Sequence, residues 1–408
     1  MRFFYTLGIR LYGLGIRLAS FFNPKAKQWI DGRKNWKNEL RNAPDLQGCI
    51  WFHCASLGEF EQGRPLLEKL KTLYPAKPIL LTFFSPSGYL VRKNYAHADY
   101  ICYLPLDTTQ NVNLFLDAFK PDLAIFVKYE VWHNFFAAIA KRNIPLLMVS
   151  AIFRENQVYF KPFGKWFRKS LLRVNTIFTQ DSESAHLLNS IGVKNVKIAG
   201  DTRFDRVIEI AAKSQDFPEL EQFSKNKITI VAGSTWPADE ELLSKYGQLH
   251  PEVRFIIAPH ETENNHVKAI LQKFPEGVRW SEKEKIGNGN AVIIDSIGLL
   301  SAIYKYGTIA YIGGGFGSGI HNTLEPAVYG MPVIFGPEHK KFREAIGLCG
   351  ANAAKSIQNF NDLESILNKL IEDRDLLATM SQNADQFVKE NAGATELILT
   401  EIQKLPKF

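Results

Sequence analysis

Residues 49–59 read CIWFHCASLGE, an apolar run followed by a turn of small residues and one acid. Six further apolar runs follow up to residue 201, and amphipathic stretches at 62–73, 109–119 and 131–142 lie between them. Continuous apolar runs are typical of strands that are covered on both faces. The alternation therefore predicts an α/β domain in which helices cover both faces of a parallel sheet.

A second series of apolar runs begins with ITIVAGST at 228–235, and helical patterns again connect the runs. The stretch between the two series, about 203–227, is polar and charged, so we place a domain boundary there. A chain of 408 residues is long enough for two such domains. The predicted organisation is an N-terminal segment at 1–40, a Rossmann-like domain at 41–205, and a second Rossmann-like domain with closing helices at 206–408.

Composition narrows the class of protein. Hydrophobic residues make up 46% and charged residues 22%, which is ordinary for a globular chain, and the net charge of +7 permits nucleic acid, acidic lipid or phosphorylated partners without choosing among them. None of the four cysteines forms a CxxC pair, so a zinc site is not expected. Such cysteine usage fits a reducing, cytosolic compartment.

The N-terminal segment has a distinct pattern. Residues 3–22 read FFYTLGIRLYGLGIRLASFF, with apolar residues at helical 3,4 spacing and arginines and glycines that argue against a full membrane span. A basic cluster follows, made up of Lys25, Lys27, Arg33, Lys34, Lys37 and Arg41. We expect an in-plane, membrane-associating helix at an anionic surface. The alternative is a helix packed on the protein's own core or on a partner.

Three charged residues follow predicted strands of the first domain, where ligands of doubly wound sheets bind. Glu59 could accept a proton from an attacking hydroxyl, or act as a first-turn helix acid. Glu130, in KYEVWHN, could shift a neighbouring pKa or orient a substrate, or it too begins a helix. Arg203, in GDTRFD, has the rigid fork of donors that suits phosphate, or it is a solvated arginine near the boundary.

A glycine-rich stretch carries the strongest motif of the second domain. Residues 308–337 read TIAYIGGGFGSGIHNTLEPAVYGMPVIFGP, in which a strand, a glycine loop and a helix start follow one another. We expect backbone N–H groups there to bind an anion. The absence of a following Lys-Ser/Thr disfavours a P-loop. Asn322 and Glu325 have capping-box spacing, so Glu325 either caps the helix or binds ribose hydroxyls. Polar residues also follow the neighbouring predicted strands of this domain. Together with the glycine-rich stretch they predict a nucleotide-binding pocket.

Taken in order, HCASLGE, SPSG, KYEVWHN, GDTRFD, DSIGLL and the glycine-rich run resemble the bacterial 3-deoxy-D-manno-octulosonic acid (Kdo) transferases of lipopolysaccharide synthesis. The resemblance covers nearly the whole chain. It implies a GT-B fold of two Rossmann-like domains that face a cleft, behind a membrane-associating helix. It also implies inverting transfer of Kdo from CMP-Kdo to the lipid A precursor, lipid IV(A), at the cytoplasmic side of the inner membrane. No metal or other cofactor and no nucleic-acid partner is implied.

The resemblance also assigns roles to residues. Glu59 becomes the general base, and Glu130 and Arg203 stabilise the transition state. The implied CMP contacts are Pro259, His260, Ile297, Gly298, Leu299, Asn322, Thr323, Leu324 and Glu325. The chain departs from the family at His260, where an arginine is usual. The alternatives are a GT-B transferase or epimerase that uses a UDP-sugar, and a non-catalytic, membrane-associated GT-B shell.

Overall fold

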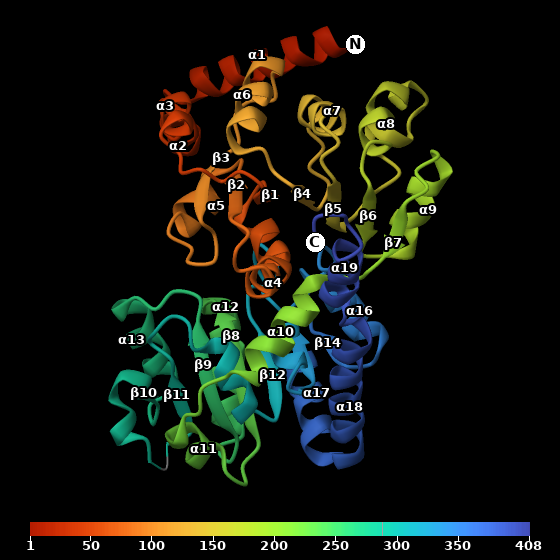
Figure 1. The fold of residues 1–408 in the computed structure, drawn as a ribbon. Coiled ribbons are helices and arrows are strands. Elements are labelled where there is room, and N and C mark those ends of the chain that lie inside the picture. Colours follow the sequence, from red (N-terminus) through yellow and green to blue (C-terminus); the bar gives the residue numbers. More distant parts are fainter. Residues whose placement is uncertain (288) are drawn as a thin grey trace. The chain divides into compact units, whose positions relative to one another are not determined.

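The computed structural model describes residues 1–287 and 289–408, which form two compact units (Figure 1). The first unit combines Met1–Asp205 with Ala392–Phe408, and the second spans Arg206–Asn391. Each unit contains one seven-stranded sheet whose neighbouring strands all pair in parallel. Helices connect the strands, so each unit is a Rossmann-like, doubly wound domain, as the sequence predicted.

The first sheet has the strand order β3-β2-β1-β4-β5-β6-β7. Its strands are β1 (Ile50–Cys54), β2 (Ile79–Phe83), β3 (Tyr100–Tyr103), β4 (Leu123–Val127), β5 (Leu146–Ala151), β6 (Thr176–Thr179) and β7 (Val196–Ile198). Every residue of β1, β2, β4 and β5 is buried, because helices cover both faces of the sheet. Each face has its own apolar core, one built around Trp51 and the other around Phe52.

Helices of the first unit lie before and between these strands. They are α1 (Arg2–Ala19), α2 (Pro24–Asp31), α3 (Trp36–Arg41), α4 (Leu57–Leu73), α5 (Pro86–Arg92), α6 (Thr109–Phe119), α7 (His133–Lys141), α8 (Lys165–Leu171) and α9 (Ser182–Ser190), with 3₁₀ turns η1 (Val158–Phe160) and η2 (Pro162–Gly164). Helix α10 (Thr202–Ala212) begins in the first unit and continues into the second.

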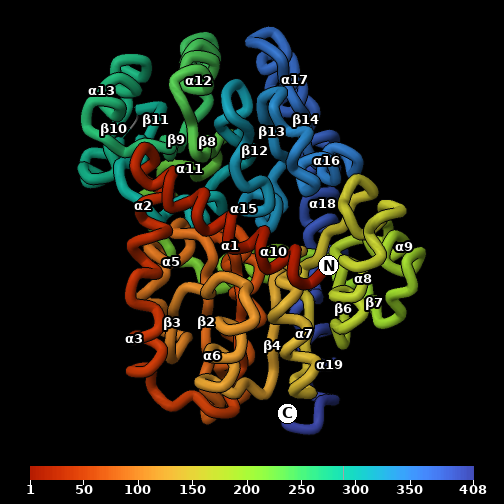
Figure 2. Tube along the Cα trace, turned by 90° about the horizontal axis from the view of Figure 1, so that it is seen from above, coloured from red at the N-terminus to blue at the C-terminus, as the bar shows by residue number. Residues whose placement is uncertain are grey.

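Helix α1 contacts the first unit along one side, from α2 to α7 and α8 (Figure 2). Tyr5 donates a hydrogen bond to Asp107 Oδ2 at 2.7 Å, and Gly13 comes so close to Leu106 that a Cβ atom would lie 2.7 Å from its side chain. The apolar stripe on the other side stays exposed and is made up of Phe3, Phe4, Leu7, Leu11, Leu14 and Leu18. Over the part of the chain that the structure describes, no helix is both long and apolar enough to cross a membrane.

The second sheet has the strand order β10-β11-β9-β8-β12-β13-β14. Its strands are β8 (Thr229–Thr235), β9 (Arg254–Pro259), β10 (Val278–Arg279), β11 (Ala291–Ile293), β12 (Ile309–Ile312), β13 (Val333–Phe335) and β14 (Ala354–Ser356). Its helices are α11 (Pro218–Ser224), α12 (Pro237–Leu249), α13 (Asn264–Lys273), α14 (Leu300–Ile303), α15 (Leu324–Ala327), α16 (Arg343–Gly350), α17 (Phe360–Glu372) and α18 (Arg374–Asn391), with 3₁₀ turns η3 (Trp280–Lys285) and η4 (Tyr304–Tyr306).

The C-terminal helix α19 (Ala394–Ile402) differs from the sequence expectation. The predicted second domain ran to residue 408, but residues 392–408 belong to the first unit. The cause is apolar packing: Ile398, Leu399 and Ile402 are buried in the same core as Ile50 and Phe52 of β1. The change from the first unit to the second lies between Asp205 and Arg206, where the sequence had placed it.

Candidate active site

Glu59 lies in the first turn of α4, directly after β1, an interior strand of the first sheet. Ser56 is the N-cap, and its hydroxyl accepts a hydrogen bond from Glu59 N–H. The Glu59 carboxylate turns back and accepts the Ala55 N–H through Oε2 at 2.5 Å. Glu59 therefore has the helix-start role that the sequence offered as its alternative. Only 6% of the residue is exposed, so its carboxylate is also removed from most of the solvent.

Burial, and after it the nearby charge of Glu130, raise the pKa of Glu59 to about 7. The Ala55 hydrogen bond and the positive charge of Lys128 act in the opposite direction but are weaker. Glu130 follows β4, the strand paired with β1, and burial raises its pKa as well. The structure thus brings the two predicted acids into one electrostatic pair. A carboxylate with a pKa near neutrality is suited to take up a proton at the pH of the cell.

Aromatic side chains surround the acid pair. The charge of Glu130 raises the pKa of Tyr12 on α1 and of Tyr159 on η1, although burial is the larger cause for both. Trp132, two residues after Glu130, packs on Phe84 with ring centroids 4.7 Å apart. The sequence assigned Trp132 to core packing and singled out none of the other rings. Their positions depend on which elements become neighbours in the fold, which no local motif reports.

Arg203, the third predicted catalytic residue, lies at the start of α10. Its guanidinium pairs with Asp201 through NH2 at 2.7 Å and Nε at 2.9 Å. Asp201 in turn accepts a hydrogen bond from Gln62, which lies one turn after Glu59 on α4. Arg203 is therefore held in place by Asp201, while a third of its side chain stays exposed. The sequence missed Asp201 and Gln62, because their partnership joins residues far apart in the chain.

The predicted CMP contacts follow three strands of the second sheet: β9, β11 and β12. Pro259 ends β9 and is buried, whereas His260 follows it and is exposed. Strand β11 pairs with β9, so the turn of Ile297, Gly298 and Leu299 lies at the same edge. Gly298 has φ +94°, a conformation that favours glycine, and Ile297 is 89% exposed.

An aromatic cluster forms at this edge. His260 stacks on Trp236 with ring centroids 4.7 Å apart, and it also lies 4.6 Å from the ring of His321. Trp236 Nε1 donates to His321 Nε2 at 3.5 Å. The sequence identified His260 but missed Trp236 and His321, although each adjoins a motif it had noted. Their rings offer flat faces on which a base can stack.

The helix start at Asn322 differs in detail from the prediction. Asn322 Oδ1 accepts the Leu324 N–H at 3.1 Å, and Asn322 Nδ2 donates to Glu325 Oε1 at 3.0 Å. Glu325 therefore binds the Asn322 side chain rather than its backbone. Helix α15 is only four residues long, so its dipole is weak. The buried hydroxyl of Thr323 has no hydrogen-bond partner within the described residues.

The glycines after β12 allow close packing of neighbouring backbones, while the anion site was predicted at the helix start that follows them. Gly313 N–H binds Gly233 O, and Gly314 N–H binds Asp239 Oδ2 at 2.9 Å. A Cβ atom on Gly315 would lie 2.6 Å from the backbone of Gly336. These glycines let neighbouring backbones approach closely, and their bonded N–H groups are not available to an anion. No cluster of three or more His, Cys, Asp or Glu side chains suited to a metal occurs in residues 1–287 and 289–408.

Comparison with known proteins identifies relatives of the chain. A sequence model described as 3-deoxy-D-manno-octulosonic-acid transferase (kdotransferase) matches residues 30–206. A protein named 3-deoxy-D-manno-octulosonic acid transferase from Aquifex aeolicus is 30% identical over 349 residues, covering 82% of this chain and 88% of that protein. The protein of the same name from Haemophilus influenzae is 27% identical and covers 98% and 97%. Among solved structures, the UDP-GlcNAc 2-epimerase from Neisseria meningitidis bound to UDP-GlcNAc is similar in fold, with a TM-score of 0.62 and 16% identity over 88% of this chain and all of that one.

Proposed function

Because this chain belongs to the 3-deoxy-D-manno-octulosonic acid transferase family, an enzyme family of lipopolysaccharide synthesis, we propose that it moves Kdo from CMP-Kdo to lipid IV(A) with inversion. The observation that carries the proposal is the pair of buried Glu59 and half-buried Glu130 after neighbouring strands. A transferase that uses a sugar hydroxyl as its nucleophile needs a base there.

In the proposed reaction, Glu59 removes the proton from an acceptor hydroxyl. The freed oxygen attacks the anomeric carbon of Kdo, and the bond to the CMP phosphate breaks on the opposite side. Glu130 keeps the pKa of Glu59 high, so that Glu59 remains a competent proton acceptor. Arg203, held by Asp201, is assigned to stabilising negative charge in the transition state.

The donor is proposed to bind to the second unit, where His260 and Trp236 stack at the strand ends. The unpartnered hydroxyl of Thr323 gives this edge a polar group that is ready to bind a ligand. The acceptor is assigned to the first unit. No step of this chemistry requires a metal, in keeping with the resemblance.

We also assign the protein to the cytoplasmic side of the inner membrane. The exposed stripe of Phe4, Leu11 and Leu18 on α1, followed by a basic segment, supports in-plane association with an anionic surface. Removal of residues 1–22 should therefore release the chain from vesicles. A truncated form that still sediments with vesicles at physiological salt would refute the anchor.

The test of the activity is incubation of the full chain with CMP-Kdo and lipid IV(A), followed by measurement of the product mass. The expected product is heavier than lipid IV(A) by whole Kdo residues and appears together with free CMP. Thermal shifts with CMP, UMP and UDP provide a second measurement. Stabilisation by UDP but not by CMP, without a Kdo product, would refute the proposed donor.

A further inference from the structure

A cavity of about 430 Å³ lies where α1 meets α2 in the first unit. Four cationic side chains line it: Arg10, Arg17, Arg33 and Lys34. The other lining residues are apolar or neutral, and none is an acid. Lys34 pairs at 2.6 Å with Asp31, which lies outside the lining, so the three arginines carry the uncompensated charge of the cavity. Arg10 and Arg17 are two helical turns apart and therefore lie on the same side of α1. The volume is in the range of cavities that hold small ligands.

Arg33 forms the buried wall of this cavity, with only 8% of its surface exposed. Its guanidinium donates to the carbonyl oxygens of Leu104, Trp29 and Phe84. The ring of Trp29 lies 3.9 Å from its central carbon, and the ring of Tyr103 lies 4.4 Å away. The arginine is thus rigidly held, but it has no carboxylate partner within the described residues.

The positive charge of Arg33 is therefore buried without a counter-charge. Burial lowers the pKa of the guanidinium, because the charged form loses water that nothing negative replaces. An anion in the cavity would supply the missing charge and would bind strongly, since charge-assisted hydrogen bonds to arginine are among the strongest in proteins.

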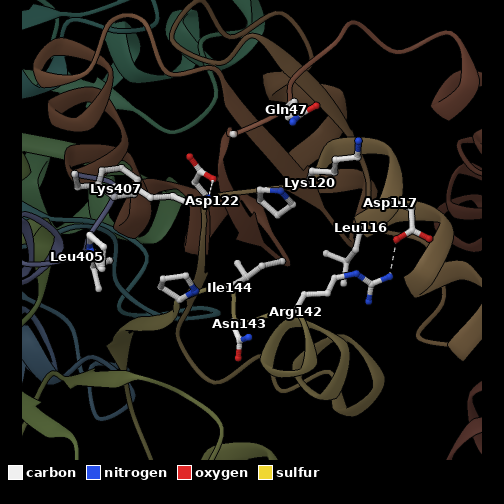
Figure 3. A pocket seen from close by; sticks show the side chains of 15 residues that line it. Gln47, Leu116, Asp117, Lys120, Asp122, Arg142, Asn143, Ile144, Leu405 and Lys407 are labelled. Atoms are coloured by element: carbon white, nitrogen blue, oxygen red, sulfur yellow. Dashed lines mark hydrogen bonds and ion pairs between the residues drawn. The ribbon is translucent and has the colours of Figure 1, made fainter.

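A second cavity of the same unit has acids in its lining. It has a volume of about 780 Å³ and lies at the amino ends of β4 and β5 (Figure 3). There Arg142 pairs with Asp117 at 2.6 Å, and Lys407 pairs with Asp122. Two acids thus stand beside the cations of this cavity, whereas no acid lines the α1–α2 cavity.

We propose that the cavity of Arg10, Arg17, Arg33 and Lys34 binds a phosphate monoester of the acceptor glycolipid. This inference deepens the proposed function and rests on it. Leu14 belongs to the exposed apolar stripe of α1 and also lines the cavity, which places apolar surface for an acyl chain beside it. A phosphorylated sugar headgroup can thus enter with its chains remaining outside.

The cavity is connected to the acid pair within the same unit. Tyr12, on α1 between Arg10 and Gly13, lies within electrostatic reach of both Arg33 and Glu130. Aromatic contacts also lead from the cavity to the acids, since Phe84 packs on both Trp29 and Trp132. A phosphate bound in the cavity would therefore hold the sugar of the same molecule near Glu130.

The test measures binding of lipid IV(A) to the full chain in neutral detergent micelles, without any donor. The variant is Arg10→Ala/Arg17→Ala, because both residues are exposed on a helix and alanine favours helix. Lys93→Ala/Lys194→Ala is the matched control, since it removes two exposed charges of the same unit away from the cavity. Dephosphorylated lipid IV(A) and vesicles of phosphatidylglycerol are the comparison ligands.

We expect the arginine variant to bind lipid IV(A) more weakly by about tenfold for each arginine lost. The control should bind it like the unmodified chain, and the dephosphorylated lipid should bind equally weakly to all three proteins. Unchanged binding of lipid IV(A) to the arginine variant would overturn the proposal. So would a loss seen only on phosphatidylglycerol vesicles, which would indicate attraction to bulk membrane charge.

This experiment can fail independently of the proposed function, because it contains no CMP-Kdo. If the phosphorylated lipid binds through the arginines but no Kdo is transferred, the proposed reaction is wrong and the phosphate site stands. If Kdo is transferred and the arginines do not affect binding, the phosphate site is wrong and the reaction stands.

Discussion

Replacement of Glu59 by glutamine separates the two roles that this residue combines. The glutamine side chain is nearly isosteric, and its amide oxygen can still accept the Ala55 N–H that Glu59 accepts at 2.5 Å. It cannot ionise, however, and so it cannot take a proton from a hydroxyl. Glu59→Gln should therefore keep the start of α4 and lose proton transfer.

The stability change has a defined sign. The pKa of Glu59 is about 7 in the folded chain, against an ordinary value of 4.5 for a glutamate. Between these two pH values the folded state holds the proton that the unfolded state has lost, so stability falls as pH rises through this window. A difference of about 2.5 units corresponds to an upper limit of roughly 3 kcal/mol. Glu59→Gln should thus be more stable than the unmodified chain at pH 8 by up to that amount, and no more stable at pH 4.

The rate of Kdo transfer by Glu59→Gln should fall at pH 8, where its stability rises. Loss of a general base costs about 10²–10⁴-fold in rate, so Glu59→Gln should be nearly inactive at pH 8. In the unmodified chain only about 1% of Glu59 would be ionised at pH 5, and kcat/KM should rise through pH 7. Glu130→Gln removes a neighbouring charge that raises this pKa, so it should move the profile towards acid pH.

The measurements are urea unfolding at pH 4 and pH 8 and the rate of Kdo transfer from pH 5 to pH 8. A flat rate profile across this range, or full turnover by Glu59→Gln, would refute Glu59 as the base. If Glu59→Gln were destabilised equally at both pH values, the carboxylate would be mainly a structural cap and the buried-charge argument would be wrong.

Two further predictions concern packing around the site. Gly63→Val should destabilise the first unit by about 1–3 kcal/mol in urea unfolding, because its ideal Cβ would lie 2.9 Å from Val127 where α4 crosses the sheet. Gly58→Ala, on the same helix with open space around it, should instead stabilise by about 0.5–1 kcal/mol, and equal effects would contradict the argument. Tyr5→Phe should lower the unfolding free energy by about 0.5–1.5 kcal/mol and speed amide exchange in the first turns of α1, because it removes the 2.7 Å hydrogen bond to Asp107. Tyr12→Phe is its control, and unchanged exchange after Tyr5→Phe would show that α1 is held by other contacts.

The sequence predicted the sheets well because their signal is local. Strands β1 and β4 are buried over their whole length and therefore appear as unbroken apolar runs. The unit to which α19 belongs could not be predicted from a local signal. Its amphipathic pattern predicts a helix with one buried face, but nothing in that pattern distinguishes the core around Phe52 from the core of the second unit. The core against which a helix packs is decided by contacts between residues far apart in the chain, and a local sequence pattern does not report those contacts.

The glycine run shows a related limit of the sequence. A glycine permits both the approach of a ligand and the approach of another backbone, and the sequence looks the same in either case. Here Gly315 meets Gly336, and Asp239 already binds the N–H of Gly314. The same limit explains why Trp236 and His321 were missed around His260. A motif identifies the end of a strand, whereas the stacking depends on which ends lie side by side.

The two interpretations of Glu59, helix acid and proton acceptor, turn out not to exclude each other. A carboxylate has two oxygens, and only Oε2 is engaged by the Ala55 N–H. The backbone of Ser56 also favours the charged form, and the oxygen that does not bind Ala55 is the one that a substrate hydroxyl would approach. The hydrogen bond at the helix start then fixes the orientation of the group that reacts. Since this bond favours the charged form, the pKa reaches about 7 only because burial and Glu130 outweigh it. A helix cap in this position can thus act as the device that holds the base.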